Sequence, residues 1–219
     1  MMAGRYAVDG NEGAFQPGSR GRVLANRLGI VRVRDMQVAE TRVLLDLTDA
    51  LLDEVGVDQR FTAQDLCDWH RRWLGNIYPW AGEYRQVNMG KAGFQFASAH
   101  LIHGLMAGFE RDVLAVQTPC DHMDDARLLA ALARTHAEFI LIHPFREGNG
   151  RLARLLNTLM ALQAGLPVLD FDGLRGRAKQ GYIAAIHAAV GCDYAPLERV
   201  FANVVRRSRR TATSSGAAL

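Results

Sequence analysis

The sequence has few cysteines and no paired cysteine motif. Among its 219 residues the only cysteines are Cys67, Cys120 and Cys192, which are widely separated. An odd number of cysteines without a C-x-x-C pair argues against a disulfide framework and against a zinc site. We therefore expect three reduced thiols in the core of a cytosolic protein.

Long apolar runs are also missing. No window approaches the roughly 18 consecutive apolar residues of a membrane span, and the beginning of the chain has no apolar stretch typical of a secretory signal. We therefore expect a cytoplasmic protein with no membrane partner. Hydrophobic residues nevertheless make up 49% of the chain, which suffices for a folded core and excludes a disordered polymer.

The chain also lacks a large net charge of either sign. The chain has 26 basic and 23 acidic side chains, so its formal net charge is only +3. Much of the excess is concentrated in Arg206, Arg207, Arg209 and Arg210, which we interpret as a solvated helix end. Without this cluster the chain lacks the basic face of a nucleic-acid-binding protein, so we expect no direct nucleic-acid binding.

Apolar residues recur at three- and four-residue spacing through most of the chain, which predicts a mainly α-helical fold. Residues 84–96, YRQVNMGKAGFQF, instead predict a small β-hairpin with a loose turn. We expect a single helical domain at 21–205, an N-terminal arm at 1–20 and a basic, disordered C-terminal tail at 206–219. The predicted helices cover residues 36–55, 62–78, 99–116, 124–142, 151–164, 174–190 and 196–207.

Residues suited to chemistry gather in one segment, HPFREGNGRLAR, at 143–154. Pro144 disfavours helical geometry at His143, and helical periodicity resumes at Arg151, so the segment is predicted to be helix, tight polar loop and helix. Gly148 and Gly150 permit backbone conformations that bulkier residues cannot adopt. Amide groups presented there at a helix N-terminus would form a cradle for phosphate.

The remaining side chains of this segment suit a polyphosphate ligand. Arg151 and Arg154 share a helix face, where two guanidinium groups can clamp a chain of phosphates. Glu147 supplies a hard oxygen ligand for a Mg²⁺ that bridges phosphates. His143 is the imidazole of the loop, the side-chain type that accepts protons near neutral pH. Phe145 is predicted to point inward and fix the loop.

This segment resembles the signature of the Fic family, which reads His, any residue, Phe, any residue, Asp or Glu, Gly-Asn-Gly-Arg, two further residues and Arg. Every specified position is filled. Residues 78–88, YPWAGEYRQVN, and the hairpin after them resemble the flap of that family, so the resemblance extends over about residues 20–205. A pattern with this many fixed positions is far more specific than a short motif.

The resemblance implies a protein adenylyltransferase, an enzyme that transfers AMP from ATP to a Tyr, Thr or Ser hydroxyl of a target protein. His143 would deprotonate that hydroxyl, and Glu147 would hold Mg²⁺. The target would dock on the hairpin flap by strand addition. The implied nucleotide-binding residues are Gly148, Asn149 and Gly150 at the α- and β-phosphates, Arg151 and Arg154 at the outer phosphates, Lys91 on the flap and Tyr182 at the nucleoside.

Other interpretations are open at this point. The related Doc proteins transfer a phosphate, but they lack the cradle glycines that are present here. Other family members transfer other phosphate-containing groups, and an inactive module that binds proteins through the flap is the non-enzymatic alternative. GNGRLA followed by Asp170 also fits a dinucleotide-binding pattern, which needs a strand directly before the first glycine. His100, His103, His136 and His143 lack the partners of a recognisable zinc site.

The sequence also lacks the inhibitory motif of many Fic proteins, which is Ser or Thr, three residues, and then Glu-Gly or Glu-Asn. Outside the segment at 143–154, its one Glu-Gly pair is Glu12–Gly13, and Val8 occupies the Ser or Thr position. By resemblance, this absence implies either a toxin-type protein that a separate small antitoxin controls, or a protein controlled in another way, such as by a degenerate inhibitory segment. A topoisomerase of the gyrase type is the target that the resemblance suggests.

Overall fold

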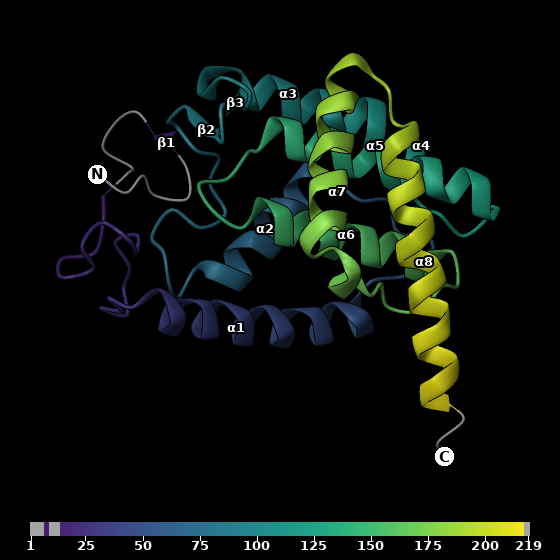
Figure 1. The fold of residues 1–219 in the computed structure, drawn as a ribbon, viewed down its shortest axis with the longest axis horizontal. Helices are drawn as coiled ribbons and strands as arrows, with labels where there is room; N and C mark the ends of the chain where they lie inside the picture. Colours follow the sequence, from purple (N-terminus) through teal and green to yellow (C-terminus); the bar gives the residue numbers. More distant parts are fainter. Residues whose placement is uncertain (1–6, 9–13, 217–219) are drawn as a thin grey trace. The chain divides into compact units, whose positions relative to one another are not determined.

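The computed structural model describes residues 7–8 and 14–216, and most of them are helical (Figure 1). The predicted mainly α-helical fold with one small hairpin is confirmed. None of the described helices is both long and apolar enough to cross a membrane. The helical elements are α1 (Val33–Glu54), α2 (Ala63–Leu74), η2 (Ala99–Leu101), α3 (Ile102–Phe109), η3 (Glu110–Leu114), α4 (Ala115–Gln117), α5 (Asp125–Ile142), α6 (Asn149–Gln163), η4 (Phe171–Gly173), α7 (Gly176–Ala188), η5 (Ala189–Gly191) and α8 (Ala195–Gly216).

The helices predicted at 62–78 and 99–116 differ from the structure in length and in regularity. α2 ends at Leu74 and not at Tyr78, because Gly75, a poor helix former, follows it. The predicted helix at 99–116 begins with the short 3₁₀ element η2 and contains the π-helical turn η3 between α3 and α4. Apolar spacing predicts the presence of these helices, but it does not reveal a local change of hydrogen-bond pattern.

α8 is longer than predicted. It continues to Gly216, so the expectation of a disordered tail is wrong for this part of the chain. Ion pairs join Arg207 to Asp170 at 2.5 Å and Arg209 to Asp125 at 2.7 Å. The hydrogen bond from Arg209 lowers the pKa of Asp125. Part of the arginine cluster therefore pairs with carboxylates of other elements, instead of being wholly solvated.

The sheet has three antiparallel strands in the order β1 (Ala7–Val8), β2 (Met89–Lys91) and β3 (Phe94–Gln95). β2 and β3 form the predicted hairpin, with Gly90 opposite Gln95. Its turn is tight and not loose, because Ala92 and Gly93 both have positive φ, of 50° and 83°, as a two-residue type I′ turn requires. β1, within the expected arm, covers the other edge of β2.

The chain forms two compact units whose segments alternate along the sequence. Large buried aromatic side chains fill each unit: Trp73, Tyr78 and Phe145 in the first, and Phe139 and Phe201 in the second. The first unit comprises residues up to 54, 63–107 and 142–149, and the second comprises 55–62, 108–141 and 150 onward.

The cysteines are all free thiols. Cys67 and Cys120 are buried as predicted, and burial raises the pKa of the Cys120 thiol to about 12. Cys192 is exposed, so the expectation of a core thiol is wrong for this residue. It occupies a left-handed position with φ of 60° directly after η5, in a surface turn.

Candidate active site

The loop that carries the sequence motif lies between α5 and α6. α5 ends at Ile142, and His143 adopts a left-handed conformation with φ of 53° that stops the helix. α6 begins at Asn149, two residues earlier than predicted. The predicted order of helix, tight loop and helix is therefore confirmed. The candidate base occupies the first position of the loop.

Asn149 closes the loop on itself. Its side-chain Oδ1 accepts a hydrogen bond from the Phe145 amide at 2.9 Å, and its Nδ2 donates to the Phe145 carbonyl at 2.7 Å. Both residues are fully buried, which confirms that Phe145 points inward and fixes the loop. Because the Asn149 side chain is used in this way, a contact from this residue to a nucleotide would come from its main chain.

His70, on α2, fixes the centre of the loop. Its Nδ1 accepts a hydrogen bond from the Gly82 amide at 2.8 Å, so Nε2 carries the proton and donates to the Glu147 carbonyl at 3.1 Å. The ring is fully buried and stacks on Phe145 with 4.0 Å between centroids. Sequence reasoning missed His70, because nothing local distinguishes it from any histidine on the apolar side of a helix.

Arg85 and Phe96 hold His143 from the side of the hairpin. The buried Arg85 guanidinium donates from Nε to the His143 carbonyl at 2.7 Å. It also donates to the carbonyls of Val87 and Ala97, both at 2.6 Å, which belong to the two ends of the hairpin. The Phe96 ring stacks on the imidazole with centroids 3.7 Å apart. A shift of the hairpin would therefore move His143. Arg85 lies in the segment that resembles the flap of the family. Nothing in the surrounding sequence predicts that its side chain would hold the His143 carbonyl.

Gly148 is required by packing as well as by backbone conformation. Its φ is 85°, and a Cβ there would lie 2.6 Å from Cζ3 of Trp73 and 3.4 Å from Cδ1 of Leu74. These neighbours are core side chains. By contrast, a Cβ at Gly150 would meet no atom within 4 Å. Of the two predicted cradle glycines, only Gly148 is therefore demanded by the fold itself.

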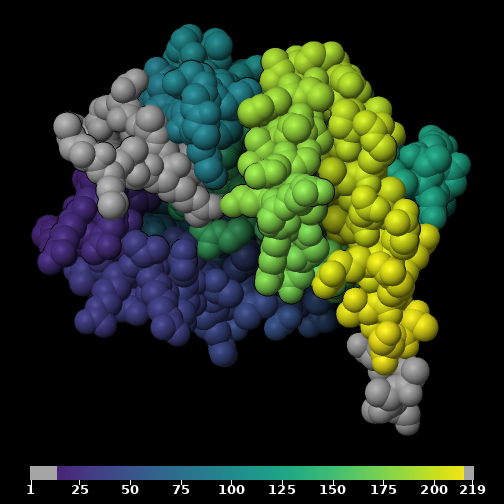
Figure 2. All heavy atoms as spheres, in the orientation of Figure 1, coloured from purple at the N-terminus to yellow at the C-terminus, as the bar shows by residue number. Residues whose placement is uncertain are grey.

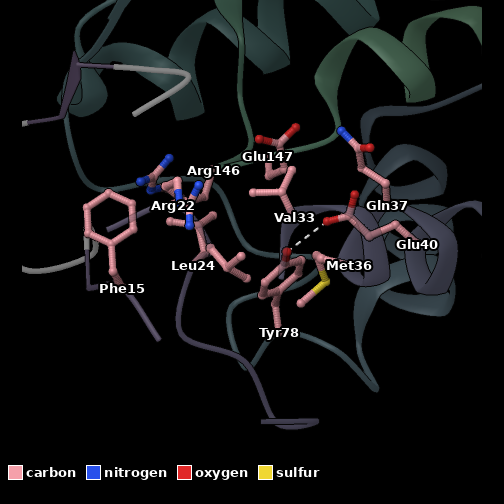
Figure 3. A pocket seen from close by; sticks show the side chains of 11 residues that line it. Phe15, Arg22, Leu24, Val33, Met36, Gln37, Glu40, Tyr78, Arg146 and Glu147 are labelled. Carbon is pink, nitrogen blue, oxygen red and sulfur yellow. Dashed lines mark hydrogen bonds between the residues drawn. The ribbon is translucent and has the colours of Figure 1, made fainter. Parts of the chain in front are cut away.

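Glu147, the predicted metal ligand, lines a pocket of about 140 Å³ (Figure 3). Its carboxylate is mostly buried and accepts a hydrogen bond from the Gly148 amide at 3.0 Å. In the same pocket the Tyr78 hydroxyl donates to the Glu40 carboxylate at 2.7 Å, as the dashed line in Figure 3 shows. The pocket is lined by Phe15, Arg22, Val23, Leu24, Val33, Met36, Gln37, Glu40, Tyr78, Arg146 and Glu147.

The donor set around Glu147 suits Mg²⁺. This ion usually takes one or two protein carboxylates and completes its coordination with phosphate and water oxygens. Within the described residues, no three His, Cys, Asp or Glu side chains are grouped as metal ligands. One carboxylate in the loop that is predicted to bind phosphate therefore fits an ion that arrives with a nucleotide better than an ion held by protein ligands alone.

Arg151 and Arg154 lie on the first turns of α6 and are half-buried. Their three-residue spacing places them on the same side of the helix, as predicted. The Arg154 guanidinium lies 5.5 Å from the centroid of the Phe171 ring, which is a cation–π distance. Contact with the Phe171 ring therefore restricts the conformations of the Arg154 side chain.

Tyr182, on α7, is tied to a buried histidine near Arg154. The Asn157 amide donates to the Leu132 carbonyl, so its Oδ1 faces Nδ1 of His136 at 2.6 Å and accepts the proton of that nitrogen. His136 Nε2 then accepts from the Tyr182 hydroxyl at 2.8 Å. Burial lowers the pKa of His136 to about 4, with a contribution from the charge of Arg154, and burial raises the pKa of Tyr182 to about 12. The Tyr182 hydroxyl is thus engaged with the protein core.

This loop lies in a part of the chain that matches a known family. A Fic/DOC family model matches residues 60–161, which include the whole loop, α5 and most of α6. The chain carries a Fic/DOC family domain. The helix α5 stands where the dinucleotide-binding pattern needs a strand, so that alternative is excluded.

Proteins with a similar Fic/DOC domain come from animals and bacteria. The chain is 29% identical over 148 residues to protein adenylyltransferase Fic of Culex quinquefasciatus, covering 67% of this chain and 28% of the relative. It is 26% identical over 207 residues to probable protein adenylyltransferase Fic of Salmonella typhimurium, covering 93% and 96%. The chain thus spans about a quarter of the insect relative and nearly all of the bacterial one.

Solved Fic domains share the fold. The N-terminal Fic domain of a Bartonella effector protein from Bartonella sp. AR 15-3 matches with a TM-score of 0.69 and 20% identity, covering 87% of this chain and 89% of that one. The effector BepC from Bartonella tribocorum, solved with bound AMPPNP, matches with a TM-score of 0.67 and 19% identity, covering 83% and 91%.

The predicted site residues belong to both units. His143, Glu147 and Gly148 of the loop and Asn149 at the start of α6 belong to the first unit. Lys91 belongs to the same unit and is exposed at the end of β2, beside the hairpin turn. The second unit contains Gly150, Arg151, Arg154 and Tyr182. Residues 143–154 remain one continuous segment, because α6 runs on from Asn149.

Proposed function

We propose that the chain is a protein adenylyltransferase that transfers AMP from ATP to a Tyr, Thr or Ser hydroxyl of a target protein. The observation that supports this most directly is the segment 143–154, which fills every position of the Fic motif and whose His143 is held by Phe96 and Arg85. The relatives named protein adenylyltransferases and the AMPPNP-bound neighbour agree with the proposal.

His143 acts as the general base in this proposal. Its imidazole accepts the proton of the target hydroxyl while the hydroxyl oxygen attacks the α-phosphorus of ATP. The bond from the α-phosphorus to the bridging oxygen breaks, and pyrophosphate leaves on the opposite side. The stacked Phe96 ring and the Arg85 hydrogen bond hold the base in place before the target binds, which lowers the entropic cost of reaching the reactive geometry.

The nucleotide is held by the start of α6 and the loop before it. Main-chain amides at Asn149 and Gly150 face the α- and β-phosphates, and the helix dipole adds a favourable field. Gly148 contributes its left-handed backbone to this cradle, because its own amide donates to the Glu147 carboxylate. Arg151 and Arg154 bind the outer phosphates through paired hydrogen bonds. We also propose the ring of Tyr182 as a nucleoside contact and Lys91 as a flap contact.

Mg²⁺ is the cofactor that this site suits, with Glu147 as its protein ligand. When bound, the ion neutralises charge on the phosphates. The hydrogen bond from the Gly148 amide orients the Glu147 carboxylate, and the His70 contact fixes the main chain of the same residue. Contacts within the protein therefore hold both the side chain and the main chain of Glu147.

We propose that the target docks on the hairpin by strand addition, along the outer edge of β3. β1 already pairs with one edge of β2, whereas no strand in the described part of the chain pairs with the outer edge of β3. Main-chain hydrogen bonds along such an edge accept varied sequences. A segment added to β3 would lie on the strand that leads into Phe96, the residue stacked on His143.

The biological setting of the proposal rests on the sequence resemblance. We propose a cytoplasmic, toxin-type enzyme whose inhibitor is a separate small protein, with a gyrase-type topoisomerase as target. The absence of a matching inhibitory motif supports this. Glu12 and Gly13, the residues nearest to such a motif, lie outside the described residues.

Labelling with two forms of ATP tests the proposal. The protein is incubated with Mg²⁺, bacterial lysate and ATP labelled either at the α- or at the γ-phosphate. AMP transfer labels a protein band only from α-labelled ATP and releases pyrophosphate. A band labelled only from γ-labelled ATP would indicate phosphate transfer, and no labelled band at all would favour the inactive binding module.

A further inference from the structure

Four large apolar side chains are exposed at seven-residue intervals along α1 and the residues just before it. They are Val31, Val38, Leu45 and Leu52, with exposed fractions of 41%, 63%, 56% and 40%. Seven residues fall only about 20° short of two helical turns, so these side chains form one line along the helix. α1 lies at the surface of the molecule, in dark blue in Figure 2.

This line, which we call the α1 stripe, lies on the side of the helix opposite the core. The core-facing residues of α1 are Met36, Glu40, Leu47 and Leu51, all of which are buried. Single exposed apolar residues are common and need no explanation. A continuous line at heptad spacing on the outward side of a 22-residue helix is instead the pattern of a helix-packing seam.

The residues between the stripe positions fit such a seam. Thr41 and Thr48 follow Val38 and Leu45 by three residues, which is the second inward position of a heptad. Thr48 already satisfies its hydroxyl by donating to the Leu44 carbonyl at 2.7 Å, so it can present its methyl group to a partner helix. These positions therefore carry small side chains that allow close approach.

Charges beside the stripe indicate what the partner is. Arg42 and Asp49 are both exposed on the same flank and lie nearly symmetrically about Leu45. If a second copy of α1 packs antiparallel, each Arg42 meets Asp49 of the other copy, and Val38 meets Leu52. Arg42 currently contacts Asp46 at 3.2 Å with 78% of its side chain exposed, a pair that contributes little to the fold and can rearrange.

We propose that the α1 stripe is an interface between two copies of this chain, packed antiparallel about a two-fold axis beside Leu45. One pair of helices about 33 Å long buries a modest area, so the dimer is weak and depends on concentration. The proposal does not rest on the proposed enzymatic function.

Sedimentation velocity over a range of protein concentrations tests the interface. The wild-type mass is expected to rise from the monomer value of 24.2 kDa toward twice that value. Leu45→Asp is expected to remain monomeric at every concentration. The matched control is Val116→Asp, an equally exposed apolar position on α4 (62% exposed), which should behave as wild type. A monomeric wild type, or a Leu45→Asp protein that dimerises as wild type, would overturn the proposal.

Charge reversal tests the antiparallel arrangement. Arg42→Asp and Asp49→Arg are each expected to weaken dimerisation by at least about 10-fold, because each places like charges opposite one another twice in a symmetric dimer. The double variant restores opposite charges and should recover most of the lost affinity. Failure of the double variant to recover, in proteins whose circular dichroism and melting match the wild type, would contradict the antiparallel pairing.

Discussion

Replacing Gly148 by alanine is expected to destabilise the fold, whereas the same replacement at Gly150 is not. Gly148 has a φ of 85°, and the added Cβ would lie 2.6 Å from a ring carbon of the buried Trp73. A side chain in the left-handed region costs about 1–2 kcal/mol. Forcing an extra carbon into a packed core costs about 1–3 kcal/mol more. The free energy of unfolding should therefore fall by about 2–5 kcal/mol.

This loss is large compared with the roughly 5–15 kcal/mol that stabilises a typical domain. Because the Trp73 side chain and not open space lies next to Gly148, a side chain added there disturbs the fold itself. Gly150 is the better probe of the phosphate cradle. A Cβ there meets no protein atom within 4 Å, so it can disturb a bound phosphate without disturbing the fold.

The assay is urea unfolding followed by tryptophan fluorescence, combined with calorimetric titration of ATP in the presence of Mg²⁺. Gly150→Ala should unfold within about 0.5 kcal/mol of wild type and bind ATP more weakly. A Gly148→Ala protein as stable as wild type would refute the packing argument. Unchanged ATP affinity in Gly150→Ala would refute the proposed cradle.

Three further predictions concern stability, positioning and regulation. Because burial lowers the pKa of His136 to about 4, its contribution to stability is complete above about pH 6.5 and decreases as the pH falls toward 4. Urea titrations at pH 7 and 4.5 should therefore show wild type losing roughly 2–3 kcal/mol more than His136→Gln, and equal losses would contradict this. Arg85→Lys removes the guanidinium that donates to several carbonyls at once. This change should lower the rate of AMP transfer by about 10-fold and leave the affinity for ATP unchanged. A wild-type rate would show that Arg85 does not position His143. Glu12→Ala should leave AMP transfer unchanged, whereas a large rise would identify Glu12 as an inhibitory residue.

Local signals in the sequence predict most of the helices and the motif loop. Apolar spacing identifies α1 and α5, and Pro144 with the following glycines identifies the loop between α5 and α6. These features depend on residues that are neighbours along the chain. The glycine motif and the acidic residue before it similarly indicate a phosphate site from composition and order alone.

Features that depend on distant partners could not be predicted. His70 and Arg85 contact the loop across 77 and 58 residues of sequence, so neither carries a local signal. The last turns of α8 follow a segment predicted to end at Arg207, and their anchor to Asp125 spans 84 residues. Likewise, β1 is a strand because it pairs with β2, which is distant from it in the sequence.

The most direct test of the account is the effect of His143→Ala on AMP transfer and on ATP binding, measured on the same protein preparation. His143 is the proposed base, and its side chain is not part of the proposed phosphate cradle. We predict that transfer of label from α-labelled ATP falls by at least about 10²-fold, while the affinity for ATP with Mg²⁺ stays close to that of wild type. Transfer at a near wild-type rate by a folded His143→Ala protein would contradict the account.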